Sequence, residues 1–299
     1  MFYRILLAGL VLLFASSCSK DLDSQTPDND TNKALVPVTV HVTGFSVSQE
    51  DFPETRATVT ALDGYDGVNA VTLAFYNGTT EIYKQTQLLS DNSNYSTFGE
   101  FRLSLPTGSY TMVAVAYYVS ASTSFALTSA TEAAYTGAHA FDTFVKNQAV
   151  NITSTDAVDI SATLERVVSL LKVVSTDGKT AGVTNVRMTL SAGGRSFNPS
   201  TGLATSNTSF VNTVGNNVAT GAISTSLTYL FLATDEQTMN VTIETLDANQ
   251  SVVRSTTVNN VPFKRNRRTI LTGPMYTHTS TAGTFQVDID WLTDAEVNF

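Results

Sequence analysis

From residue 35 onward, apolar and polar residues alternate along much of this chain. The first such segment, residues 36–42, reads Val-Pro-Val-Thr-Val-His-Val, which places Val36, Val38, Val40 and Val42 at every second position. Successive side chains of a β-strand point to opposite faces of the sheet. The pattern therefore predicts a strand with one buried face and one exposed face.

Similar signals recur at the spacing that is typical of β-sandwiches. We expect further strands at 70–76, 81–89, 98–105, 110–118, 150–152, 158–164, 183–190, 209–214, 226–233, 239–247, 252–258, 269–277 and 285–291. Asn77-Gly78, between the strands expected at 70–76 and 81–89, favours a type I′ hairpin. Two segments are less regular: 121–149 indicates loops and a short helical turn, and 164–174 fits either a helix or a strand.

These strands predict an all-β fold of two tandem antiparallel β-sandwich domains. We place the N-terminal sandwich at 35–163 and the C-terminal sandwich at 164–299. Composition supports this class, because the 299 residues include 46 Thr and 29 Ser while only 14% are charged. Threonine favours pleated sheets, and few lysines and glutamates are available to fill exposed helices.

The first 17 residues have the organisation of a secretory signal peptide. Arg4 precedes an apolar run at 5–14, which is too short to span a bilayer, and small residues follow at 15–17. The single cysteine, Cys18, comes next, and this arrangement resembles a bacterial lipobox, whose cysteine is acylated, for example with palmitate. Residues 18–34 are polar and predict a flexible tether. The alternative is a soluble secreted protein with a chance cysteine.

The search for catalytic and metal-binding motifs is mostly negative. The histidines His41, His139 and His278 are far apart in sequence, and Asp288 and Asp290 indicate the solvated face of a strand. The dense basic segment 264–268 favours a solvated or carboxylate-paired turn over a ligand site. A net charge of −9 argues against nucleic-acid binding. We therefore expect no enzymatic activity, no catalytic residues, no cofactor and no metal.

Four stretches together carry a resemblance to a known family. They are the lipobox at 15–18, Glu-Thr-Arg-Ala at 54–57, Leu-Glu-Arg-Val-Val at 164–168, and Val-Pro-Phe-Lys-Arg-Asn-Arg-Arg-Thr at 261–269 followed by Gly273. The chain resembles the Bacteroidales fimbrillins and fimbrillin-associated anchor proteins, which are lipoprotein subunits of type V pili. Ser-Lys-Asp-Leu-Asp after Cys18 likewise resembles the surface-export signal of Bacteroidetes lipoproteins.

The resemblance implies two transthyretin-like sandwiches in an outer-membrane lipoprotein at the cell surface, within a fimbrium. It further implies that a trypsin-like surface protease cuts between Arg56 and Ala57 and removes the strand that carries the four valines. A strand from another fimbrial subunit then fills the groove by β-augmentation. The donor expected here is the C-terminal segment 285–299, in which Phe285, Val287, Ile289 and Trp291 alternate.

Two alternatives remain open at this point. The chain can be an anchor or tip subunit that does not polymerise. It can also be a surface lipoprotein that binds glycans or host ligands through sandwich loops, with tyrosines such as Tyr117, Tyr118 and Tyr135 as candidates for exposed contact residues.

Overall fold

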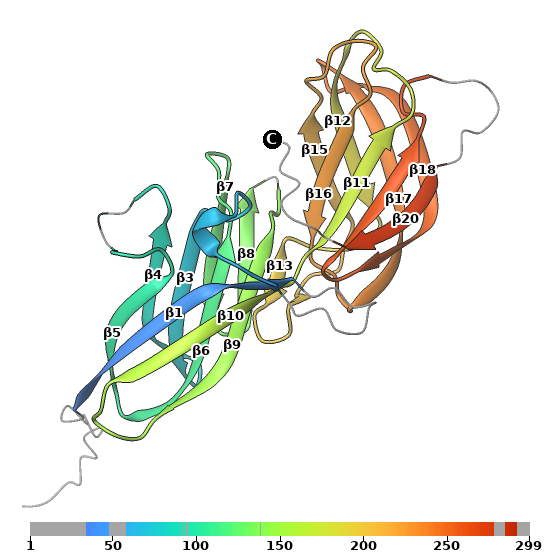
Figure 1. The fold of residues 1–299 in the computed structure, drawn as a ribbon. Helices are drawn as coiled ribbons and strands as arrows, with labels where there is room; N and C mark the ends of the chain where they lie inside the picture. The colour runs from blue at the N-terminus through green and yellow to red at the C-terminus, as the bar shows by residue number, and fades with distance from the viewer. Residues whose placement is uncertain are drawn as a thin grey trace, which may run out of the picture. The chain divides into compact units, whose positions relative to one another are not determined.

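The computed structural model describes residues 34–47, 58–91, 93, 95–137, 139–277 and 285–291. These residues form strands and one short 3-10 turn, η1 (Leu62–Gly64), and the expected all-β class is confirmed (Figure 1). None of them forms a helix with the length and apolar character that crossing a bilayer requires. The signal peptide, Cys18, Arg56, Ala57 and His278 lie outside the described residues.

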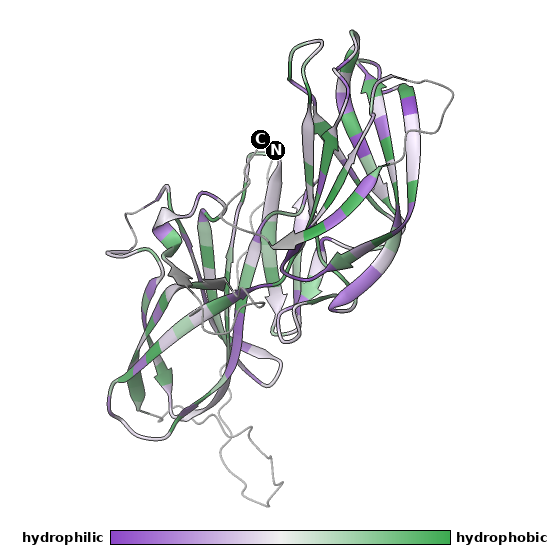
Figure 2. Cartoon of the chain, turned by 45° about the vertical axis from the view of Figure 1, so that its right-hand side comes forward, coloured by the Kyte–Doolittle hydropathy of each residue, from purple (hydrophilic) through white to green (hydrophobic). Residues whose placement is uncertain are grey.

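We call strands β1 to β10 the N-terminal lobe. Their bounds are β1 Leu35–Val47, β2 Thr58–Thr60, β3 Ala70–Asn77, β4 Thr80–Leu88, β5 Glu100–Pro106, β6 Gly108–Tyr117, β7 Thr123–Ser129, β8 Glu132–Gly137, β9 Thr143–Ile152 and β10 Val158–Arg166. The alternation of apolar and polar residues along these strands is visible in Figure 2.

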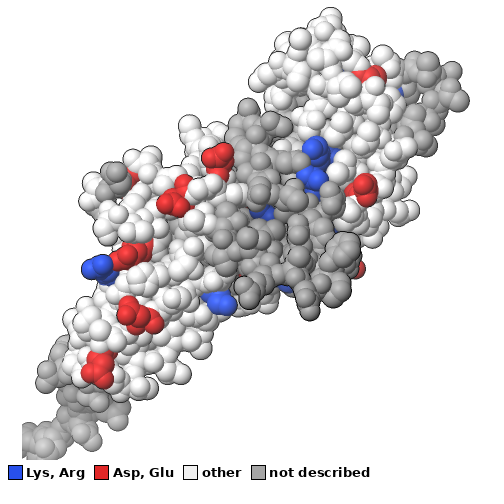
Figure 3. All heavy atoms as spheres, in the orientation of Figure 1, with Lys and Arg blue, Asp and Glu red and all other residues white. Residues whose placement is uncertain are grey.

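Strands β11 to β20 form the C-terminal lobe. Their bounds are β11 Ser169–Ser175, β12 Val183–Leu190, β13 Ser196–Asn198, β14 Leu203–Ala204, β15 Phe210–Gly215, β16 Thr225–Leu230, β17 Glu236–Asp247, β18 Val252–Lys264, β19 Arg267–Gly273 and β20 Gln286–Trp291. Charged side chains are sparse on the face of the molecule shown in Figure 3, in line with the composition.

The strands of the N-terminal lobe lie in two facing layers. One layer has the order β5-β1-β10 and the other β4-β3-β6-β9, and the two are linked where β10 pairs with β9 at only Glu165 and Arg166. Most pairs are antiparallel, but β1 and β10 are parallel. Between the layers lies a core that includes the valines of β1, Phe75 of β3 and Met112 of β6.

The C-terminal lobe repeats this topology. Its layers have the orders β16-β11-β19 and β15-β12-β17-β18, with β11 and β19 parallel as β1 and β10 are. Strand β11 thus takes the place that β1 takes in the first lobe. The second lobe differs by one added strand, since β20 pairs with the outer edge of β19. A separate core fills the space between these layers.

A third apolar cluster and a small sheet join the lobes. The sheet has the order β14-β13-β8-β7, so a strand of one lobe pairs with a strand of the other. Phe197 stacks on Phe231 at 4.4 Å between ring centroids, and Phe125 of β7 lies 6.3 Å from Phe197. Both lobes therefore share buried apolar surface, whereas the domain boundary near residue 164 stays a prediction.

The structure corrects three details of the expected elements. The β3–β4 hairpin is present, but its central residues are Gly78 and Thr79, and only Gly78 has a positive φ. A type I′ turn would require a positive φ at β-branched Thr79 as well, which is sterically unfavourable. Segment 121–149 holds β7, β8 and most of β9 with no helical turn, and 169–175 of the ambiguous segment is a strand, β11.

Candidate functional site

Strand β1 is an internal strand of its layer. On one side it pairs in parallel with β10, and on the other it pairs with β5 over residues 35–41 and with β2 over residues 45–47. Among the described strands, β5 pairs only with β1. Removal of β1 would therefore expose main-chain donors and acceptors on both β5 and β10.

The four valines of β1 all face the core. Val36, Val38, Val40 and Val42 are 0%, 1%, 0% and 4% exposed. Their neighbours in the same layer include Phe101 and Leu105 of β5, and all of these residues belong to one apolar cluster. The groove that β1 occupies is thus apolar, and its pockets follow the two-residue period of a strand.

Gly99 marks the point where β1 changes its partner from β5 to β2. The Val42 amide donates to the Gly99 carbonyl at 2.9 Å, and the pairing with β10 shifts register between Val42 and Gly44. Buried Gln87 fixes this point, because its side chain accepts from the Gly99 amide and donates to the Glu100 carbonyl. A Cβ on Gly99 would lie 2.7 Å from the Val42 carbonyl oxygen, so glycine permits the close approach.

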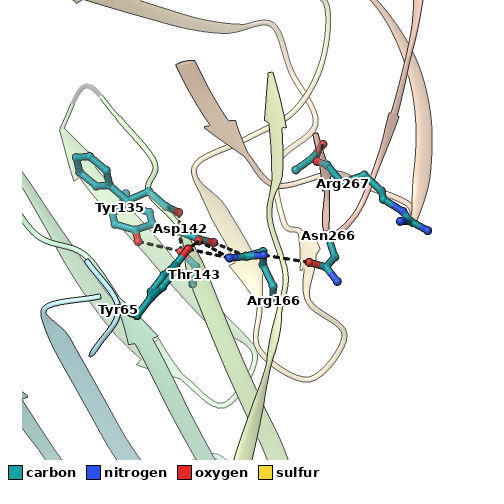
Figure 4. A network of polar contacts seen from close by, with 9 residues as sticks. Tyr65, Tyr135, Asp142, Thr143, Arg166, Asn266 and Arg267 are labelled. Carbon is teal, nitrogen blue, oxygen red and sulfur yellow. Dashed lines mark hydrogen bonds and ion pairs between the residues drawn. The ribbon is translucent and has the colours of Figure 1, made fainter. Parts of the chain in front are cut away.

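A buried polar cluster lies against the C-terminal end of β1. Phe45 stacks on Phe144 at 4.0 Å, and the Arg166 guanidinium lies 4.7 Å from the centre of the Phe144 ring. Arg166 donates to both oxygens of Asp142 at 2.9 Å and to the Tyr65 hydroxyl at 2.8 Å (Figure 4). Tyr65 contacts Phe45 edge to face, so the end of β1 packs on side chains that this arginine holds.

The electrostatics of this cluster favour a charged arginine and a neutral tyrosine. Burial tends to lower the pKa of Arg166, but the Asp142 carboxylate outweighs it and raises that pKa above its usual value. Burial, followed by the charge of Asp142, raises the pKa of Tyr65. The Arg166 and Asp142 side chains are 1% and 2% exposed, so each charge depends on the other.

The cluster also reaches the turn between β18 and β19. Arg166 contacts the Asn266 side chain at 3.5 Å, and the Asn266 amide donates to the Val168 carbonyl. In the same turn, Lys264 pairs with Glu236 and Arg265 with Asp235, each at 2.8 Å. This is the carboxylate-paired turn expected for the basic segment.

Strand β20, the expected donor, is held much more loosely than β1. It pairs only with β19 among the described strands, and Val287 and Ile289 are 42% and 41% exposed. Phe285 packs partly against the core of the second lobe, and Trp291 is the last residue of the strand. The two segments named for strand exchange thus lie in different lobes and are not brought together within the chain.

The two described histidines, His41 and His139, lie apart, on β1 and in the β8–β9 connection. His41 lies 4.0 Å from Glu100 and 3.8 Å from Asp159, and His139 hydrogen-bonds to Asn212. No group of three or more potential metal ligands occurs in the part of the chain that the structure describes.

Sequence reasoning missed the Arg166 cluster and misjudged two tyrosines. Arg166 was noted only as part of residues 164–168, one of the stretches that carry the family resemblance. Its partners Asp142 and Tyr65 lie 24 and 101 residues away. Tyr117 and Tyr135 were candidates for exposed ligand contacts, but both are buried and hydrogen-bonded, to Thr72 and Thr143 respectively. An aromatic residue on a core-facing strand position buries its ring, and its hydroxyl then finds a partner.

Comparisons with known proteins agree on the fold. A model described as "Family of unknown function (DUF6562)" matches residues 33–298. No curated protein matches the sequence. The fimbrial anchor protein Mfa2 from Porphyromonas gingivalis has a similar structure with a TM-score of 0.51 at 10% identity, over 87% of this chain and 99% of that one. Two candidate adhesins from Bacteroides ovatus each give a TM-score of 0.50, with 13% and 11% identity over 82% and 89% of this chain and 88% and 97% of theirs.

Proposed function

The chain belongs to DUF6562, a family of unknown function, and from the position of its first strand we propose that it is a structural subunit of a cell-surface fimbrium, not an enzyme. In this proposal, a trypsin-like surface protease cuts after Arg56, and β1 is then exchanged for a strand of another fimbrial subunit. Acylation at Cys18 holds the precursor at the outer membrane before assembly.

The observation that carries the proposal is the internal position of β1 next to the proposed cleavage site. Arg56 lies in the sequence between the end of β1 at Val47 and the start of β2 at Thr58. One cut after Arg56 therefore separates β1 from the rest of the fold. Strand β2 follows the cut and stays covalently attached to the rest of the fold. The remaining acceptor has an apolar groove and two unpaired strand edges, which are the features that an incoming β-strand requires.

Burial energies explain why a cleaved β1 would stay in place until it is displaced. Full burial of one valine side chain contributes about 1.5 kcal/mol, so the four valines contribute about 6 kcal/mol. This is a large part of a typical domain stability of about 5–15 kcal/mol. Release of β1 thus requires a competing strand that fills the same groove.

The C-terminal segment supplies a strand with matching periodicity. Phe285, Val287, Ile289 and Trp291 alternate with polar residues, and the aromatic ones are larger than the valines of β1. In the subunit itself this strand lies at a sheet edge, with the Val287 and Ile289 side chains partly exposed. Transfer of these side chains into the groove of another subunit would bury apolar surface that is now in contact with solvent.

The test combines two changes in the full-length protein. Arg56→Ala is expected to block processing by a trypsin-like protease, and truncation after Gly283 is expected to permit processing but to prevent polymer growth. SDS-resistant ladders after protease treatment are the readout. Arg102→Ala is the matched control, since Arg102 is an arginine with a 77% exposed side chain on β5 and its loss should leave ladders unchanged.

Two results would contradict the proposal. Normal ladders from Arg56→Ala would show that cleavage at this position is irrelevant, which would favour a non-polymerising anchor or tip subunit. Ladders formed by the truncated protein alone would show that the C-terminal segment is not the donor.

A further inference from the structure

A pocket of about 400 Å³ lies where loops at one end of the N-terminal lobe meet β15 and β16. Its walls come from Gly67 before β3, the β6–β7 connection, the β8–β9 connection, β15 with the residues that follow it, and β16. A β-bridge between Ala140 and Tyr229 fixes the two sides against each other. None of the described lining residues belongs to β1 or β20, so strand exchange removes no described wall of this pocket.

The lining combines tyrosine rings with small polar side chains. Tyr118 and Tyr229 are partly exposed there, and Ser120, Ser122 and Asn217 are exposed near them. Tyrosine provides a rigid surface that is apolar on its face and polar at its tip, while serine and asparagine provide adaptable hydrogen bonds. This composition is typical of surfaces that recognise hydroxyl-rich, uncharged ligands by contact with both an apolar face and a polar rim.

The pocket carries little net charge. Asp142 is the only carboxylate among the described lining residues, which include no lysine or arginine. Both Asp142 oxygens accept hydrogen bonds from Arg166, so this carboxylate is already neutralised. An anionic ligand would lose its hydration without gaining a cationic partner, which is unfavourable.

A relay of buried side chains orients one hydrogen-bonding group of the lining. The Asn212 side-chain nitrogen donates to the Thr228 hydroxyl, so the Asn212 side-chain oxygen faces His139 Nδ1 and can accept a hydrogen bond from it. In the tautomer that donates from Nδ1, His139 Nε2 is available to accept a hydrogen bond from a ligand. An acceptor next to tyrosine rings suits a ligand hydroxyl group.

We propose that this pocket binds one or two rings of an uncharged sugar. A pyranose has a face of C–H groups that packs on tyrosine and an edge of hydroxyls that bonds to histidine, serine and asparagine. The volume lies near the lower end of the range of about 300–1,000 Å³ that small-molecule sites occupy, which fits a short saccharide. The site is independent of fimbrial assembly and gives the subunit a ligand of its own.

The experiment measures sugar binding to the uncleaved full-length protein by isothermal titration calorimetry. The probes are galactose, mannose, N-acetylglucosamine and lactose, with glucuronic acid as the anionic comparison and glycerol as a non-cyclic polyol. Each is titrated to about 10 mM, where a ligand with a Kd of about 1 mM approaches saturation. At least one uncharged sugar should bind saturably, and glucuronic acid and glycerol should not.

Substitutions at Gly215 test the location of the site. A Cβ on Gly215 meets no atom closer than the Asn217 side chain at 3.7 Å, so the fold tolerates a side chain there. Gly215→Trp should fill the pocket and weaken binding at least tenfold, whereas Gly215→Ala should bind as the unmodified protein does. Tyr118→Ala should also weaken binding, with the partly buried Tyr95→Ala outside the pocket as its control.

Three results would overturn the inference: no saturable binding of any uncharged sugar, binding that Gly215→Trp and Tyr118→Ala leave unchanged, or tighter binding of glucuronic acid. Each of these leaves the fimbrial proposal untouched, because ladders and sugar binding are measured separately. Thermal unfolding of every variant shows that a loss of binding is not a loss of fold.

Discussion

At the scale of single residues, the burial of Arg166 could not be predicted from the sequence. Arginine is seldom fully buried, so its default prediction is a solvent-exposed side chain. Here it is buried because a carboxylate and a tyrosine, distant in sequence, converge on it. The four valines of β1, in contrast, could be assigned to the core from their spacing alone, since an alternating apolar series has one favourable orientation.

Replacement of Arg166 by methionine should strongly destabilise the protein. The change leaves the Asp142 carboxylate buried without its cation, and such losses cost about 3–5 kcal/mol. The control is Arg187→Met, because Arg187 and Glu244 form a partly exposed pair that should contribute less than about 1 kcal/mol. Urea unfolding measures both variants.

A double variant separates loss of charge pairing from loss of packing. Asp142→Leu combined with Arg166→Met removes both charges, and it should recover much of the stability lost in Arg166→Met. Equal destabilisation by Arg166→Met and Arg187→Met would show that the buried pair has no special role.

At the scale of elements, the alternation of apolar and polar residues predicted most strands. It did not predict the strands in which this alternation is weak. The predicted strand 183–190 coincides with β12, whereas β18 extends to Lys264 beyond the predicted end at residue 258. Beyond residue 258, Asn260 adopts a positive φ of 56° and the strand continues with a shift of register. The strands β7 and β8 were missed because Ala, Ser and Thr give no clear apolar period there.

The two faces of β1 should respond differently to a charge. Val38→Asp places a carboxylate at a position that is 1% exposed, whereas Thr43→Asp places one on the exposed face of the same strand. We expect Val38→Asp to destabilise the precursor by several kcal/mol, because an unpaired charge is buried. Thr43→Asp should stay within about 0.5 kcal/mol of the unmodified protein.

Thermal unfolding of the uncleaved precursor measures this difference. Similar melting temperatures for the two variants would mean that the valine face of β1 does not pack in the core in solution.

At the scale of the whole molecule, the sequence indicated two sandwiches but not how their strands are joined. The parallel pairing of β1 with β10 connects residues more than 100 positions apart, and no local pattern encodes it. The shared apolar cluster around Phe197 and Phe231 could not be predicted from the sequence either, because its residues come from separate segments of both lobes. Likewise, the pocket proposed to bind sugar could not be located from the sequence, since its described walls come from five separate segments.

The predicted membrane attachment of the whole chain rests on one residue. Cys18→Ala should move the protein from the membrane fraction to the soluble fraction, because Cys18 is the only cysteine available for acylation. Cell fractionation followed by immunoblotting measures this, with Ser19→Ala as the neighbouring control. An unchanged membrane fraction would contradict the lipoprotein prediction.

The repeated topology of the two lobes limits how many neighbours one chain can recruit. Strand β11 takes the same place in the second lobe as β1 takes in the first, but β11 continues from β10 through Val167 and Val168 and is attached at both of its ends. A single backbone cut can therefore free β1 and cannot free β11. Under the proposed strand exchange, each chain would offer one acceptor and one donor, so its valency would be two. Growth by strand exchange would yield an unbranched, polar filament whose subunits all point in one direction.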